Sequence, residues 1–246
     1  MAKATTPPTP TRRAPRSSTR QPLTPDRVLD AALSLADAEG LDALSMRRVA
    51  SALGVEAMSL YNHVANKDAL LSGLVDRVVG EIDLPAIGGD WRAEMRRRAV
   101  SAHATLTRHP WAALLIISRI SVGPMMLRYI NATVGCLREA GFSYAQADHA
   151  WNAIDSHVYG FTVQALKFPL KPEEYAPAAR GYLPMIPPDL PYFRGLTAEV
   201  AEGRHDGLHA FTFGLDLILD GLERVRLASL AESPSETPPP QHPTGA

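Results

Sequence analysis

The sequence predicts an all-α fold in two domains. Apolar residues recur at helical spacing in most segments from about residue 25 to residue 228, and no segment alternates apolar and polar residues as a strand does. The stretch from Pro85 to Asp90 marks the boundary between the domains. We expect a disordered basic arm over 1–22, a three-helix domain over 23–83, a larger helical domain over 84–230 and a disordered tail over 231–246.

The first helix is predicted to begin after Thr24. Thr24 is a suitable N-cap, Pro25 suits the first helical position, and Asp26 lies near the positive end of the helix dipole. Apolar residues then follow at helical spacing until Gly40, where we expect the helix to end.

Two short helices joined by a tight turn are predicted next. Ser45 is a good N-cap for the first, and Gly54 supplies the turn. In the second, Leu60 and Val64 face inward at i, i+4, while the opposite face is small, polar or flat. This arrangement is a helix-turn-helix, whose second helix enters the major groove of DNA. Asn66 is then expected to cap a third helix over 67–83.

The segment LSMRRVASALGVEAMSLYNHVANKDALL resembles the DNA-binding segment of the tetracycline-repressor (TetR) family of bacterial one-component regulators. The matching elements, in order, are Arg48-Val49-Ala50, Leu53-Gly54-Val55, Leu60-Tyr61, His63-Val64, Asn66-Lys67 and Leu70-Leu71. The alternative is a helical hairpin inside another all-α protein. That alternative is disfavoured because a buried hairpin would not need Tyr61, Asn62 and Lys67 exposed together.

The resemblance implies DNA contacts at nine positions: Arg47, Arg48, Ala57, Met58, Ser59, Tyr61, Asn62, His63 and Lys67. Tyr61 and Lys67 match family contacts to phosphate, and both suit a helix N-terminus near the DNA backbone. Arg47, Ala57 and Met58 match positions that often meet base edges. His63 suits packing between helices equally well.

The charge of the first domain weakens the DNA interpretation slightly. Residues 23–83 hold five Lys/Arg against ten Asp/Glu, and the whole chain has a formal net charge of −1. Phosphate contacts need only a few correctly placed cations, however, and Arg47, Arg48 and Lys67 lie at helix starts. Residues 1–22 are basic, without acids and rich in Pro, Ser and Thr. A solvated tail is the simpler interpretation of this arm, and a contact along the DNA backbone or minor groove is the alternative.

In the second domain we expect helices over 91–108, 111–120, 124–140, 144–166 and 206–228. Two of them carry apolar seams that advance by four and three residues, as in coiled coils. These seams predict a homodimer joined by two helices from each subunit, with an interface at Trp151, Val158, Gly214, Leu217, Ile218 and Gly221. The intervening segment 169–191 holds seven prolines and is expected to be a long loop that covers a pocket or wraps the partner subunit.

A pocket for an unknown small-molecule effector is expected among the helices of the second domain. Such pockets are mostly apolar with a few polar groups. The candidates are His103, Arg119, Met126, Tyr129, Trp151, Asn152 and Asp155, each of which also suits the core or an interface. The family positions that bind tetracycline fall on Asp83, Arg98, Ala102 and Ile116, whose side chains depart from the binding types. We therefore do not expect tetracycline to be the effector.

No catalytic residues, metal site or cofactor are expected. His205 and His209 have metal-ligand spacing beside Asp206, but two ordinary exposed histidines are the simpler interpretation. The single cysteine, Cys136, excludes an intrachain disulfide, and the longest apolar run, from Trp111 to Ile117, is too short to span a bilayer. We expect a cytoplasmic, ligand-responsive repressor that leaves a palindromic operator when the effector binds. The alternative is a helical small-molecule-binding or protein-interaction module that has lost DNA binding.

Overall fold

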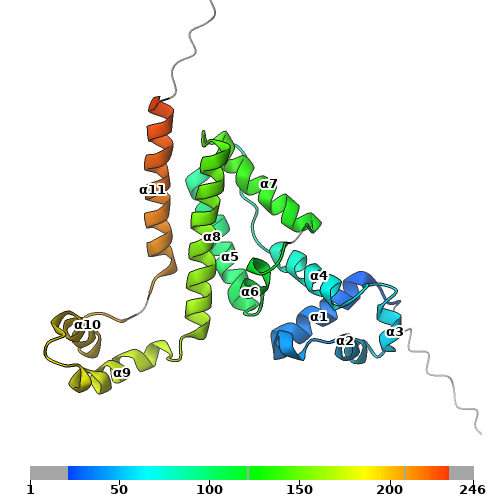
Figure 1. The fold of residues 1–246 in the computed structure, drawn as a ribbon, viewed down its shortest axis with the longest axis horizontal. Helices are drawn as coiled ribbons and strands as arrows, with labels where there is room; N and C mark the ends of the chain where they lie inside the picture. The colour runs from blue at the N-terminus through cyan, green and yellow to red at the C-terminus, as the bar shows by residue number, and fades with distance from the viewer. Residues whose placement is uncertain (1–21, 121, 208, 233–246) are drawn as a thin grey trace, which may run out of the picture.

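The computed structural model describes residues 22–120, 122–207 and 209–232 (Figure 1). Across these residues every regular element is a helix, which confirms the predicted all-α fold. The predicted basic arm and C-terminal tail lie almost entirely outside the described residues.

The N-terminal helices follow their capping residues. The helices are α1 (Pro25–Glu39), a short 3-10 turn (Leu41–Ala43), α2 (Met46–Leu53), α3 (Ala57–Leu60) and α4 (Lys67–Val79). The side chains of Thr24, Ser45 and Asn66 accept hydrogen bonds from backbone amides in the first turns of α1, α2 and α4. Helix α4 starts at Lys67, as predicted for the helix over 67–83, but it ends at Val79, before the expected Asp83.

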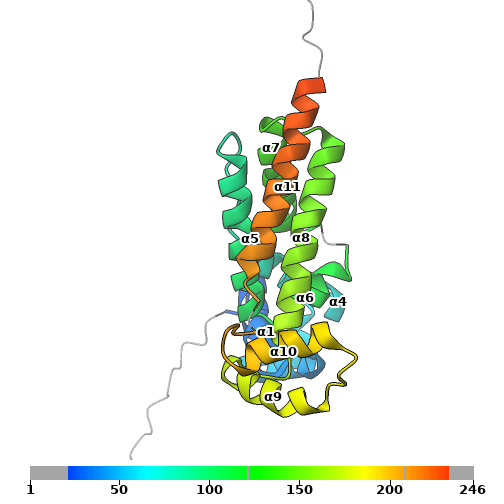
Figure 2. The same cartoon turned by 90° about the vertical axis from the view of Figure 1, so that its left-hand side faces the viewer.

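The second domain is built on α5 (Trp91–Arg108), α6 (Ala112–Ile117), α7 (Pro124–Glu139), α8 (Tyr144–Lys167) and α11 (Phe211–Glu232). The long helices α8 and α11 lie side by side, with α5 and α7 packed behind them (Figure 2). Their core includes Met95, Leu137, Ile154 and Leu215, and the lone cysteine, Cys136, is buried in it. Among the described residues, no helix is both long and apolar enough to cross a membrane.

The proline-rich segment is helical, so the prediction of a long loop over 169–191 is wrong. It contains two 3-10 turns (Pro172–Glu174 and Leu183–Met185), α9 (Tyr175–Tyr182) and the start of α10 (Pro191–Ala201). Three of the prolines open these elements, where the missing amide proton costs no hydrogen bond. The two helices form an arm at the end of the molecule opposite α1–α3 (Figure 1).

Helix α4 joins the two cores. Leu70 and Leu74 are fully buried in the core of the first domain, while Val75, Val78 and Val79 are buried in the core of the second. Truncating a fully buried leucine costs about 2–5 kcal/mol of unfolding free energy, so α4 cannot detach from either core without a large loss of stability. A displacement of α4 therefore changes the packing of both domains.

Candidate functional site

The surface of the helix-turn-helix is set by two buried anchors. Leu60 and Val64 are buried as predicted, in the core that α3 shares with α1, α2 and α4. Gly54 closes α2 with φ of 65°, a left-handed conformation that glycine adopts without steric strain. The turn leaves the Met58 side chain 75% exposed, with Tyr61 and Asn62 exposed beside it. Ala57, Ser59 and His63 are half-buried on the same element.

The three predicted cations are placed differently from one another. Arg47 and Arg48 are exposed in the first turn of α2, but the Arg48 guanidinium is paired with Glu39 of α1 over 2.6 Å. Lys67 is exposed at the first position of α4. There the N-terminal amides and the positive end of the helix dipole reinforce its charge toward an anion. These nine positions lie between the first turn of α2 and the first residue of α4, and their contact with DNA stays a prediction.

A cleft in the second domain gathers most of the predicted effector residues. It has a volume of about 460 Å³, and it is lined by six of the seven candidates: Arg119, Met126, Tyr129, Trp151, Asn152 and Asp155. The rest of its wall was not among the candidates: Ile116, Ile117, Ile120, Ile130, Ser156 and Tyr159. Ile116 was matched by resemblance to a family drug-binding position, but the other isoleucines gave no signal, because an apolar residue at a cleft cannot be told from a core residue by its type.

His103, the seventh candidate, lies outside this cleft. Its ring is stacked on Phe211 at 4.4 Å between centroids, and its Nδ1 lies 2.8 Å from the hydroxyl of Thr162. The His157 ring stacks on the same phenylalanine at 5.0 Å. His103 is therefore part of the packing that holds the start of α11 against α5 and α8, and it does not line this cleft.

A buried ion pair forms the floor of the cleft. The side chain of Arg98 is fully buried, and its Nη2 donates to Asp155 Oδ1 over 2.7 Å. The other oxygen of Asp155 accepts from Trp151 Nε1 over 2.6 Å. Arg98 also donates to the Tyr129 hydroxyl, and burial raises the pKa of this phenol well above its ordinary value, so it stays neutral. The Tyr129 hydroxyl therefore keeps its proton beside Arg98.

Two contacts connect the cleft to α4. Arg119, on the cleft wall, forms an ion pair with Asp68 in the first turn of α4. The carboxylate of Asp76, two turns further along α4, accepts from the backbone amides of Met125 and Met126 over 2.9 Å each. Since Met126 lines the cleft, a ligand there contacts residues held directly by α4.

The predicted dimer seams are mostly internal to one chain. Val158 is buried against α5 and α11 and offers no surface to a partner, while Trp151 is half-buried and lines the cleft. At Gly214 a Cβ would collide with the ring of His157 of the same chain, so this glycine allows close packing within one chain. The exposed face of α11 instead presents Leu217, 57% exposed, with Phe213 and Gly221 near it. Ile218 is half-buried beside the core.

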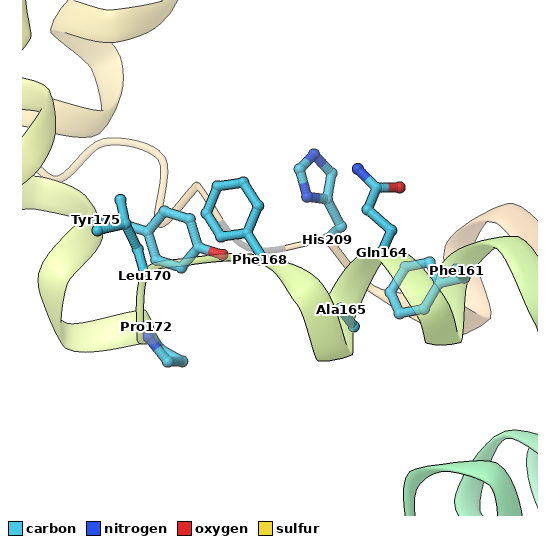
Figure 3. A pocket seen from close by; sticks show the side chains of 8 residues that line it. All are labelled: Phe161, Gln164, Ala165, Phe168, Leu170, Pro172, Tyr175 and His209. Carbon is cyan, nitrogen blue, oxygen red and sulfur yellow. The ribbon is translucent and has the colours of Figure 1, made fainter. Parts of the chain in front are cut away.

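A second, smaller cavity lies where α8 meets the arm. It has a volume of about 220 Å³, and its walls are mostly apolar (Figure 3). Phe168 and Tyr175 stack there at 5.4 Å, and Gln164 and His209 supply the polar groups. His209 precedes α11 rather than lying on it, so the expected start of this helix at residue 206 is wrong. His205 and His209 consequently do not share the helical face on which their metal-ligand spacing depended.

Comparison with known proteins agrees with this architecture. Residues 28–74 match the family model of the bacterial regulatory proteins of the tetR family, and residues 84–226 match that of the tetracyclin repressor-like C-terminal domain. The HTH-type transcriptional repressor DrrR1 of Streptomyces coeruleorubidus is 36% identical over 228 residues, covering 87% of this chain and 82% of DrrR1. The class D tetracycline repressor protein of Escherichia coli is 32% identical, covering 84% of this chain and 92% of that protein.

Among solved structures, the TetR family protein ActR of Streptomyces coelicolor in complex with actinorhodin has a TM-score of 0.69 and 29% identity, covering 86% of this chain and 100% of ActR. Both domains, their order and their helical packing are thus shared with these proteins. The chain belongs to the tetracycline-repressor family of bacterial transcriptional regulators.

Proposed function

We propose that the chain is a homodimeric transcriptional repressor that binds a palindromic operator through residues 23–83 and a small-molecule effector through residues 84–230. The observation that carries the proposal is the direct attachment of the effector cleft to α4, whose first residue, Lys67, belongs to the DNA surface. Two similar proteins support the proposal: DrrR1 is named a transcriptional repressor, and ActR has been solved in complex with the small molecule actinorhodin.

The mechanism follows from the rigidity of α4. Two recognition helices of a dimer must lie about 34–36 Å apart to enter successive major grooves on one side of the duplex. An effector that moves Arg119 or Met126 displaces α4 and changes this separation. Because binding equilibria are reciprocal, the operator must weaken effector binding by the same factor.

The dimer in this proposal uses the exposed face of α11 around Leu217, together with the adjacent face of α8. Each half-site alone binds weakly, so the linked pair gains affinity from effective concentration. Tetracycline is not proposed as the effector, because the family positions that bind that drug fall on Asp83, Arg98, Ala102 and Ile116, whose side chains depart from the binding types.

Binding of the purified protein to the DNA upstream of its own gene tests the proposal. We expect affinity for that DNA to exceed affinity for a random duplex of the same length by at least about a thousandfold at physiological salt. Fluorescence anisotropy at several salt concentrations measures both. Equal affinity for the two duplexes at every salt concentration would show that the chain is not an operator-specific regulator, and would favour a ligand-binding module instead.

A further inference from the structure

The effector cleft contains one positive charge, that of Arg119, which no negative charge among the described residues of the cleft neutralises. Among the described residues that line the cleft, Arg119 and Asp155 are the charged ones, and Arg98 lies beneath them. Asp155 is already occupied, since one oxygen accepts from Arg98 and the other from Trp151. The cleft therefore presents one cation, the Arg119 guanidinium, whose counter-charge comes from outside the cleft.

That counter-charge, Asp68, is held in a way that favours exchange. The Arg119 side chain is 21% exposed, whereas that of Asp68 is 75% exposed. An exposed carboxylate regains most of its hydration when it leaves an ion pair, and exposed pairs contribute little stability. Asp68 also lies in the first turn of α4, where the helix dipole stabilises a negative charge without a cationic partner.

We propose that the effector carries an anionic group that replaces Asp68 on the Arg119 guanidinium. This inference rests on the proposed effector site and names the chemical class that the site accepts: a largely apolar, aromatic molecule bearing a carboxylate or another acidic oxygen. Arginine binds carboxylates through two parallel hydrogen bonds, and such charge-assisted bonds are stronger inside a cleft than in water. Trp151, Tyr129 and the isoleucines supply the apolar contact.

The exchange also explains how binding would weaken the operator complex. While Arg119 holds Asp68, the negative charge next to Lys67 is neutralised. When an anionic ligand takes Arg119, the Asp68 carboxylate becomes unpaired one residue away from the proposed phosphate contact. Like charges repel, so the released carboxylate opposes the DNA backbone at the place where Lys67 attracts it.

Matched acid and amide probes test the inference on the DNA-free protein. The probes are benzoate, 2-naphthoate and anthracene-2-carboxylate, each compared with its primary amide by isothermal titration calorimetry at pH 7.5. We expect at least one carboxylate to bind about tenfold more tightly than its amide. Arg119→Gln should abolish that preference, while Asp68→Asn should tighten carboxylate binding several-fold because it removes the competing anion.

Arg128→Gln, which changes an exposed arginine of α7 outside the cleft lining, is the matched control and should keep the wild-type preference. The inference is overturned if no carboxylate binds more tightly than its amide, including the case in which none binds, or if the preference survives Arg119→Gln. Operator binding is measured separately. Specific operator binding without a carboxylate preference would refute this inference alone, whereas a preference without operator binding would refute the proposed function alone.

Discussion

The carboxylate of Asp76 accepts a hydrogen bond of 2.9 Å from the backbone amide of Met126, a residue 50 positions away that lines the cleft of the second domain. The N-cap of α7, Gly123, has no side chain to satisfy the first amides of that helix. Asp76 performs this role from α4, so the capping interaction of one helix is also the joint between the two domains.

Replacing Asp76 by alanine should lower the free energy of unfolding by about 1–2 kcal/mol, as the loss of an N-cap does. Urea denaturation followed by circular dichroism measures this change. Gly123→Ala should act in the same direction, because a Cβ at this position collides with the Asp76 carboxylate. If both variants unfold at the wild-type midpoint, α7 does not depend on α4 for its cap.

Lys67 and Met58 should contribute to DNA binding in different ways. Lys67 lies at a helix start and can meet only phosphate, so Lys67→Ala should weaken binding to operator and random DNA alike, and should lower the salt slope by about one unit per half-site contact. Met58 is uncharged and exposed on α3, so Met58→Gln should shift the preferred base at one symmetric position by about 1–3 kcal/mol.

Binding isotherms at several salt concentrations on single-base operator variants distinguish these outcomes. A change of base preference in Lys67→Ala, or a change confined to the salt slope in Met58→Gln, would mean that α3 does not enter the major groove as proposed.

Local sequence signals predicted where the helices begin, but they could not predict which distant residues form ion pairs. Thr24, Ser45 and Asn66 cap helices where expected, because a capping bond joins residues only two or three positions apart. Five of the six predicted residues that line the cleft stood out in the sequence as polar or aromatic side chains, and the sixth is Met126. The pairs that define the cleft chemistry, Arg98–Asp155 and Arg119–Asp68, are 57 and 51 positions apart, and only the packed helices bring them together.

Helical seams were misleading about which neighbour they face. The spacing of Val158 and Leu215 predicts a packed stripe, and both are indeed buried, but a neighbouring helix of the same chain can bury a stripe as well as a partner subunit. The helices α9 and α10 of the proline-rich segment were missed for a different reason. Prolines usually end helices, yet Pro191 opens α10, where its fixed φ favours the helical conformation.

Leu217→Glu should produce a folded monomer with little operator affinity. The residue is exposed on α11, so a charge is tolerated in the isolated chain but costs several kcal/mol when it is buried unpaired in a dimer interface. Sedimentation velocity at micromolar concentration measures the assembly, and circular dichroism confirms the fold.

Two comparisons make this experiment specific. Val158→Glu, which places a charge in the core of one chain, should unfold the protein rather than dissociate it. Leu114→Glu, on the exposed side of α6, should stay dimeric. A wild-type monomer at micromolar concentration, or a dimeric Leu217→Glu variant, would contradict the proposed interface.

The stability of the protein should fall on mild acidification, partly through His103. Burial, followed by the nearby His157, lowers the pKa of His103 below its ordinary value of 6.5. The unfolded chain therefore binds a proton more readily than the folded one, so folding stability is lost as the pH falls from about 6.5 toward the lower folded-state pKa. His103→Gln removes the titrating group and can still hydrogen-bond to Thr162, so the stability of this variant should depend less steeply on pH in that window.

His149→Gln, which replaces an exposed histidine on α8, is the control and should keep the wild-type slope. Urea midpoints measured between pH 5 and pH 8 decide the question, and an unchanged slope in His103→Gln would show that the imidazole beside Phe211 titrates alike in both states.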